Sequence, residues 1–258
     1  MCLLSVSSAE ETVLSQTFTA DQSSDGKDAA AGANEKRIAL LPFENLTDEK
    51  DILQEINPAI KYQLEGKGFE VIYSDDLQGF LCEKRVRSNG HVSRDLAAAI
   101  RDEFDVRAIL TGSVLSFSSD ENPQFGILLR LIEASSGTIL WADYASATGD
   151  DFMTILGLGK IKSVYSLIPK VMDNLFASFH ERVLYKKEST SHKVAVIPFQ
   201  NNSEFKNAGK IVMYMFLVEM LKSEKYEPVE YGNTRNQIID LRIWNRGAMD
   251  YDSIRTLS

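Results

Sequence analysis

The sequence predicts an α/β fold with a mixed sheet, in which a strand–helix–strand crossover precedes an antiparallel meander and a long closing helix. Three observations predict it. A short apolar run ending in Pro-Phe opens each of two similar segments, helical periodicity follows each run, and period-two alternation fills the middle of the chain. The chain has 258 residues, which is enough for one or two domains.

One stretch of the sequence occurs twice, 156 residues apart. Residues 36–47 and 192–203 share a basic residue, four apolar residues, Pro-Phe, an Asn and a hydroxyl side chain. A spacing of this size is too long for a solenoid repeat and is close to the length of a domain. The sequence therefore predicts a tandem duplication, with a second copy that is truncated at residue 258.

The first copy begins with the continuous apolar run Ile38 to Leu41, which is typical of a strand covered on both faces. Pro42 has no N–H to donate to a ladder, so the strand should end there. Apolar residues then recur at helical spacing over residues 53–64, and a short strand is expected at 69–73. This order predicts a right-handed crossover between two parallel strands.

The second copy repeats that order with a strand at 194–197, a helix at 212–221 and a short strand within 225–229. Both copies carry an Asn and a hydroxyl residue after the first strand. These pairs are Asn45 with Thr47 and Asn201 with Ser203. They match the glycosylation pattern, but their position favours turn and cap roles.

The remainder of the first copy predicts a meander between helices. We expect helices at 77–82 and 93–104, strands at 106–117, 124–134 and 138–145, and a closing helix at 151–182. Gly112 inside its strand marks a bulge or a close backbone approach. In the next strand, Phe125, Ile127, Leu129 and Leu131 alternate against Arg130 and Glu133, and alternation places Arg130 on the face opposite the four apolar residues.

Three parts are expected along the chain: a flexible arm at 1–35, a complete domain at 36–187 and an incomplete second copy at 192–258. The arm is rich in Ser, Asp and Gly, and it resembles the remnant of an export signal, with small residues at Ser7 and Ala9. Apolar stretches are too short for a transmembrane helix. The signal-like residues predict an exported protein, with a periplasmic or outer-membrane-associated location.

The charge and cysteine content exclude several classes of function. The net charge of −9 argues against nucleic acid as the main partner. Two cysteines rule out a disulfide framework. Cys82 follows Gly-Phe-Leu, which predicts a small buried side chain, and a reactive thiol is the weaker alternative.

The remaining motifs point to structure more than to chemistry. Residues 157–160, Gly-Leu-Gly-Lys, lack the third glycine and the Lys-Ser/Thr of phosphate loops, so helix packing is favoured. Residues 111–114 do not have nucleophile-elbow spacing. The acidic pairs 75–76 and 150–151 are expected at helix starts, where acids stabilise the helix by about 0.3–1 kcal/mol.

The three histidines are His91, His180 and His192, and no two of them have metal-ligand spacing. No residue is therefore assigned a catalytic, cofactor-binding or metal-binding role. The binding residues stay unassigned.

Residues 38–45, 106–114 and 129–141, in this order, resemble the TolB amino-terminal/CsgG-like superfamily. That group includes the curli secretion lipoprotein and the lipoprotein activators of penicillin-binding proteins. The resemblance covers residues 37–179 and resumes at Lys193. It implies a mixed α/β domain of the bacterial envelope that binds other proteins and is not catalytic.

The leading hypothesis is thus a non-enzymatic envelope accessory protein that acts as a protein-binding module, without a cofactor. Its expected partners are envelope proteins and not nucleic acid, and homo-oligomerisation is left open. The alternative is a regulatory domain that senses a ligand or a nucleotide. A hydrolase ranks third, because no nucleophile with an adjacent base is specified.

The second copy is too small to bury its own apolar residues, since a two-stranded piece is not independently stable. We therefore expect it to dock on the first domain. Val194 and Val196 should lie in a sheet, and the face of Met213 to Leu221 should pack on the first domain or on its own strands.

Overall fold

The computed structural model describes residues 35–49, 52–86, 90–154, 158–185 and 192–240. We call residues 35–185 the first unit and residues 192–240 the second unit. The large sheet contains β1 (Arg37–Leu40), β2 (Glu44–Asn45), β3 (Glu70–Ile72), β4 (Ala108–Ser118), β5 (Gln124–Glu133) and β6 (Ile139–Thr148). The helices of the first unit are α2 (Ile52–Gly66), α3 (Asp75–Glu83), α4 (Arg94–Phe104) and α5 (Val164–Leu175). The second unit contains β7 (His192–Ala195), α6 (Ala208–Lys222), β8 (Tyr226–Val229) and α7 (Tyr231–Asp240).

The large sheet is mixed and has the order β3-β1-β4-β5-β6. β1 runs parallel to β3 and β4, whereas β4, β5 and β6 form an antiparallel meander. This confirms the predicted α/β fold with a crossover followed by a meander. The sequence did not reveal β2, which resumes after Pro42 and pairs in parallel with β4 through Glu44 and Ser113.

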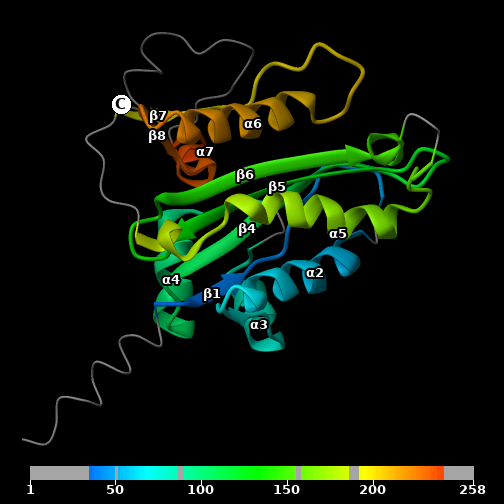
Figure 1. Ribbon diagram of the computed structural model, residues 1–258. Helices are drawn as coiled ribbons and strands as arrows, with labels where there is room; N and C mark the ends of the chain where they lie inside the picture. Colours follow the sequence, from blue (N-terminus) through cyan, green and yellow to red (C-terminus); the bar gives the residue numbers. More distant parts are fainter. Residues whose placement is uncertain (1–34, 50–51, 87–89, 155–157, 186–191, 241–258) are drawn as a thin grey trace, which may run out of the picture.

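One face of the sheet is covered by α2 and α5 (Figure 1). Alternate residues of β5, including Ile127 and Leu129, point into this layer, because successive side chains of a strand face opposite ways. Phe43 and Ile60 are fully buried in it. This layer is the main hydrophobic core of the first unit.

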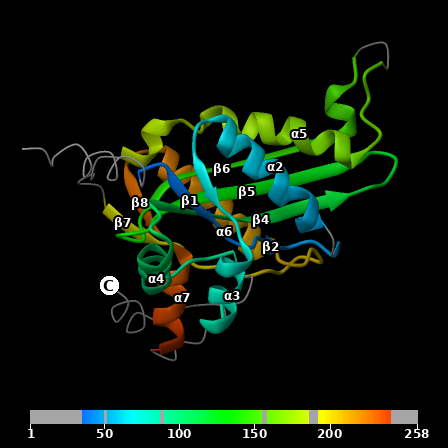
Figure 2. The same ribbon diagram turned by 90° about the horizontal axis from the view of Figure 1, so that it is seen from below.

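The opposite face of the sheet is divided between the two units. The helices α3 and α4 cover β1 and β4, where Ala39 and Ile109 are buried. The helix α6 of the second unit covers β5 and β6, where Leu128 and Ala142 are buried. Two views place α2 and α5 on one side of the strands and α6 on the other (Figure 1, Figure 2). The second unit therefore completes a face that the first unit leaves half covered.

The docking of α6 agrees with the expectation for the second copy. Met213, Leu217 and Leu221 are buried against the first unit. Val194 lies in β7, as predicted, and pairs with β8. The prediction that Val196 lies in the sheet is wrong, because β7 ends at Ala195 and its pairing with β8 stops there, although Val196 is buried. Whether the second unit folds alone, and where the domains divide, stay predictions.

Elements of the second unit follow their first-unit counterparts at the spacing of the repeated stretch. The helix α6 begins and ends 156 residues after α2, and β8 and α7 begin 156 residues after β3 and α3. Both units pair their two strands in parallel. The register differs by one residue, since Arg37 pairs with Glu70 whereas Lys193 pairs with Glu227.

The turn after the first strand also has the same hydrogen bonds in both units. The side-chain oxygen of Asn45 accepts from the backbone N–H of Thr47 at 2.9 Å and from its hydroxyl at 2.7 Å. The side-chain oxygen of Asn201 accepts from the same groups of Ser203 at 3.0 and 2.7 Å. The turn role predicted for these pairs is therefore confirmed.

The closing helix was predicted too long. A 3₁₀ turn at Gly149–Phe152 takes the place of its start, and α5 begins only at Val164. Gly159 adopts φ of 89°, a left-handed conformation that helices exclude. Beyond α5, the expected helix breaks into further 3₁₀ turns that end at Tyr185.

Candidate functional site

A buried ion pair joins the middle of β5 to the second unit. Arg130 and Glu230 both have fully buried side chains, and Nε of Arg130 donates to Oε2 of Glu230 at 3.0 Å. Oε1 of Glu230 also accepts from the backbone N–H of Val92 at 3.3 Å, and Nη2 of Arg130 donates to the carbonyl of Gly90. Removing one partner of such a pair leaves a charge buried without compensation.

The ring of Tyr214 from α6 covers the Arg130 guanidinium at 4.3 Å from its centroid. Burial alone would lower the pKa of Arg130, but Glu230, Tyr214 and Glu44 together raise it above its usual range. Burial also raises the pKa of Tyr214 well above that of a free tyrosine, although Arg130 opposes the change. Arg130 therefore remains charged and Tyr214 remains neutral at any physiological pH.

A second polar contact between the units surrounds Glu44 of β2. Lys210 of α6 forms an ion pair with Glu44. The hydroxyls of Ser113 and Tyr214 donate to Oε2 of Glu44 at 3.3 and 3.4 Å. The groups around Glu44 and Arg130 are paired across the two units, except for Nη1 of Arg130, which has no hydrogen-bond partner among the described residues. This junction fixes how the two units sit together.

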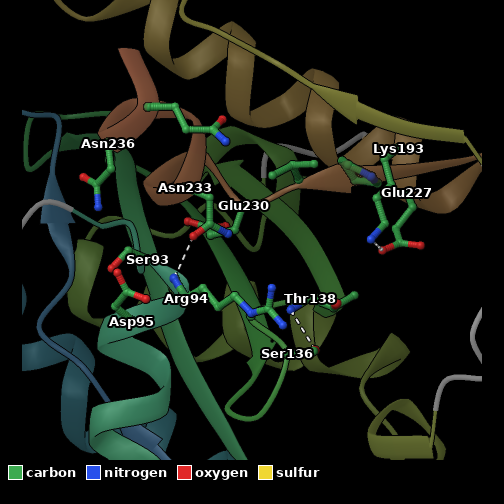
Figure 3. A pocket seen from close by; sticks show the side chains of 14 residues that line it. Ser93, Arg94, Asp95, Ser136, Thr138, Lys193, Glu227, Glu230, Asn233 and Asn236 are labelled. Carbon is green, nitrogen blue, oxygen red and sulfur yellow. Dashed lines mark hydrogen bonds and ion pairs between the residues drawn. The ribbon is translucent and has the colours of Figure 1, made fainter. Parts of the chain in front are cut away.

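A polar cavity of 510 Å³ opens beside this junction. Figure 3 shows side chains from the start of α4, the turn before β6, and β7, β8 and α7 facing it. Oδ1 of Asn233 accepts from the backbone N–H of Arg94 at 2.7 Å, and Lys193 lies 4.0 Å from Glu227. Both positive and negative side chains line the cavity, so its lining does not select a ligand of one charge.

An apolar surface lies on the side of α6 that points away from the sheet. We call it the outer face of α6, and it consists of Val212, Phe216 and the adjacent Phe199. These side chains are 49%, 48% and 46% exposed, and the rings of Phe199 and Phe216 meet edge-to-face at 6.0 Å. Since the inner side of α6 is also apolar, the helix has hydrophobic residues on both sides.

Of the residues singled out in the sequence, Cys82 lies where it was not expected. The prediction of a buried side chain is wrong, because Cys82 is exposed on α3. Leu77 and Leu81 are the buried positions of this helix, and the next residue turns about 100° toward solvent.

The motif residues lie apart from one another. Gly112 is in β4, where an added Cβ would meet the carbonyl oxygen of Leu128 at 2.3 Å, so the predicted close approach is present. Gly157 lies outside the described residues, and Lys160 forms an ion pair with Asp150 at 2.8 Å. The acids Asp75 and Asp76 occupy the first turn of α3, as predicted.

The histidines do not form a site. His91 lies beside the ring of Tyr231 at 5.7 Å, whereas His180 and His192 are exposed elsewhere. Within the described parts of the chain, no three His, Cys, Asp or Glu side chains are placed to hold a metal ion. None of the described helices is long and apolar enough to cross a membrane.

Sequence reasoning missed the role of Arg130. Alternation correctly placed it on the face opposite Ile127 and Leu129, but that face is covered by the second unit and not by solvent. The signal was the apolar residues on both sides of the strand, since Leu128 and Ile132 flank Arg130 on its own face. Apolar residues on both sides are typical of a strand that is buried on both faces.

No family model matches the sequence, and no curated protein matches it. The fold is similar to several solved structures at low identity. Lipoprotein GNA1162 from Neisseria meningitidis is 16% identical, with a TM-score of 0.42 over 56% of this chain and 99% of the other. The PelC dodecamer from Paraburkholderia phytofirmans is 16% identical, with a TM-score of 0.39 over 55% and 86%. The LpoB C-terminal domain from Escherichia coli is 15% identical, with a TM-score of 0.35 over 44% and 82%. Membership of the TolB/CsgG-like superfamily stays a prediction.

Proposed function

We propose that the protein is a non-catalytic accessory domain of the bacterial cell envelope that binds another protein. The observation that carries this proposal is the outer face of α6, with Val212, Phe216 and Phe199 about half exposed. Contiguous apolar surface of this kind is a common mark of a protein-binding site. The envelope location rests on the sequence resemblance and on the signal-like residues at the start of the chain.

The helix itself supports a binding role. A helix with apolar residues on two opposite sides is normally buried on both of them. The inner side of α6 is buried by the first unit, through Met213 and Leu217, but the outer face has no cover among the described residues. Aromatic side chains such as Phe216 are enriched at the centres of protein interfaces. A partner that covers this face would give α6 the burial that its sequence requires.

A photo-crosslinking amino acid placed at position 216 of the full chain tests the proposal in the native host. We expect one discrete cross-linked species, recovered with the envelope fraction. The same amino acid at Tyr62, which is 76% exposed on α2, serves as the control and should give none. Cross-linking that is equal at both positions, or absent at 216, would overturn the binding proposal. Recovery of the native protein in the cytosol would overturn the location.

The cavity beside the junction supports a second candidate, a regulatory domain that senses a ligand. Its volume of 510 Å³ lies within the range of small-molecule sites. Its lining is more polar than is usual for such sites, which places this candidate second. A thermal-shift screen with nucleotides and sugars would favour it if one compound raised the melting temperature reproducibly.

A further inference from the structure

The two small crossover units differ at the edge of their first strand. In the first unit, β1 is paired on both sides, with β3 on one edge and β4 on the other. In the second unit, β7 pairs with β8 on one edge, and within the described residues no strand lies along the other. An unpaired edge presents backbone N–H and C=O groups to any extended chain that can reach them.

The two units also differ in the helix beside that strand. Ile56 and Ile60 of α2 are fully buried, and the residues 156 positions later, Val212 and Phe216, are about half exposed. The phenylalanine after the first strand differs between the units in the same way. Phe43 is fully buried, whereas its counterpart, Phe199, is 46% exposed. The positions that β4 and α5 help to cover in the first unit are therefore uncovered in the second.

We infer that the edge of β7 and the outer face of α6 together receive an extended apolar strand of a partner protein, aligned parallel to β7. This rests on the proposed protein-binding function and names how the partner binds. The backbone of the added strand would pair with β7, and its inward side chains would cover Phe199 and Phe216. Strand addition of this kind draws affinity from main-chain hydrogen bonds and specificity from alternate side chains.

The strand β4 of the first unit shows which side chains such a partner strand needs. It runs parallel to β1, with Ala108 opposite Ile38 and Leu110 opposite Leu40. Its side chains Ala108, Leu110 and Val114 lie in the same core as Phe43. The partner strand should therefore carry small or medium aliphatic residues at alternate positions. A second copy of this chain cannot offer its own β4, because that strand is already paired with β1 and β5.

The test uses the full chain and a fluorescent peptide with the sequence of residues 106–118 as the probe. We expect saturable binding, together with slower amide exchange at β7 in the complex. Phe216→Asp should weaken binding by at least about tenfold, as for an aromatic residue at the centre of an interface. Val212→Asp is a second variant on the same face, and both positions are exposed enough for the variants to fold.

Two controls separate strand addition from simple apolar contact. Tyr62→Asp on α2 should leave the affinity unchanged. A peptide that is N-methylated at alternate residues should lose binding, because it cannot donate to the edge of β7. No binding by the unmodified peptide, or binding that ignores Phe216→Asp or N-methylation, would overturn the inference.

The outcomes also distinguish this inference from the proposed function. A cross-link at position 216 without peptide binding would leave a protein-binding surface but refute the strand. A dimer that is lost in Phe216→Asp would make a second copy the occupant and would likewise refute it. Absence of both the cross-link and peptide binding would refute the inference and the function together.

Discussion

The helices α2 and α6 occupy corresponding places in the two units, yet they use opposite sides. Ile60 of α2 faces the core, whereas Phe216, its counterpart, faces outward. Tyr62 of α2 is 76% exposed, whereas Val218, its counterpart, is fully buried against the first unit. The comparison teaches that the neighbouring elements determine which side of a helix is buried. The helix α6 has apolar residues on two sides, which is enough to pack against two neighbours.

The largest expected effect concerns the ion pair that exists only because the units meet. Glu230→Ala would leave Arg130 charged and buried, so we expect a loss of about 3–5 kcal/mol in the free energy of unfolding, measured in urea. Asp48→Ala is the matched control. Its ion pair with Lys206 also joins the units but is exposed, and its removal should change stability by less than about 1 kcal/mol. Equal losses in the two variants would show that the junction does not hold the units together.

The next effect sharpens the contrast between the two helices. Ile60→Ala opens a cavity in the core and should cost about 2–5 kcal/mol. Phe216→Ala removes a larger side chain, but from a surface, and should cost on the order of 1 kcal/mol or less. Urea unfolding of both variants measures this. A cost for Phe216→Ala as great as that for Ile60→Ala would mean that the outer face of α6 is not free.

A smaller effect concerns how closely α7 approaches the first unit. A Cβ on Gly232 would meet the backbone carbon and oxygen of Val92 at 2.5 Å, so Gly232→Ala should cost about 1–3 kcal/mol. A Cβ on Gly79 of α3 would have no other atom within 4 Å. Gly79→Ala should therefore stabilise the helix by about 0.5–1 kcal/mol. Thermal melts of the two variants should therefore shift in opposite directions. A shift of the same sign in both would contradict the close contact.

The last effect is confined to alkaline pH and is a change of stability with pH. Burial raises the pKa of Tyr214 in the folded state, whereas the unfolded chain loses that proton near pH 10. Its contribution is therefore complete below pH 10 and falls as the pH rises above it, by about 1.4 kcal/mol per pH unit. Tyr214→Phe removes that contribution, so stability between pH 10 and 12 should fall less steeply. An unchanged slope, after correction for the difference at pH 7, would show that the hydroxyl is not buried in solution.

Much of the fold could be predicted because its signals are local. Pro42 ended a strand, and alternation around Ile127 marked the meander. The turn at Asn45 was visible from residue types alone. The closing helix was overextended because the acidic pair 150–151 indicated a helix start, whereas Gly159 adopts a backbone conformation that a helix excludes. Local patterns thus placed the elements better than their ends.

The candidate site was less accessible to sequence reasoning, because its contacts join distant residues. Arg130 and Glu230 are 100 residues apart, and no local pattern relates them. The exposure of Phe216 was equally hidden, since its neighbours on α6 are as apolar as itself. The comparison of Phe216 with the buried Ile60 of α2 shows that one apolar side of α6 is buried and the other is exposed.

The separation between Arg130 and Glu230 has a consequence for synthesis on the ribosome. At about 5–20 residues per second, β5 exists for roughly 5–20 seconds before its partner carboxylate is made. During that time the half-covered sheet face carries a charge at its centre, between Leu128 and Ile132. A charge within an apolar strand discourages the pairing of nascent chains with one another. We therefore expect Arg130 to limit aggregation of chains that do not yet have the second unit, and Arg130→Leu should increase aggregation of chains released at residue 185, measured by light scattering.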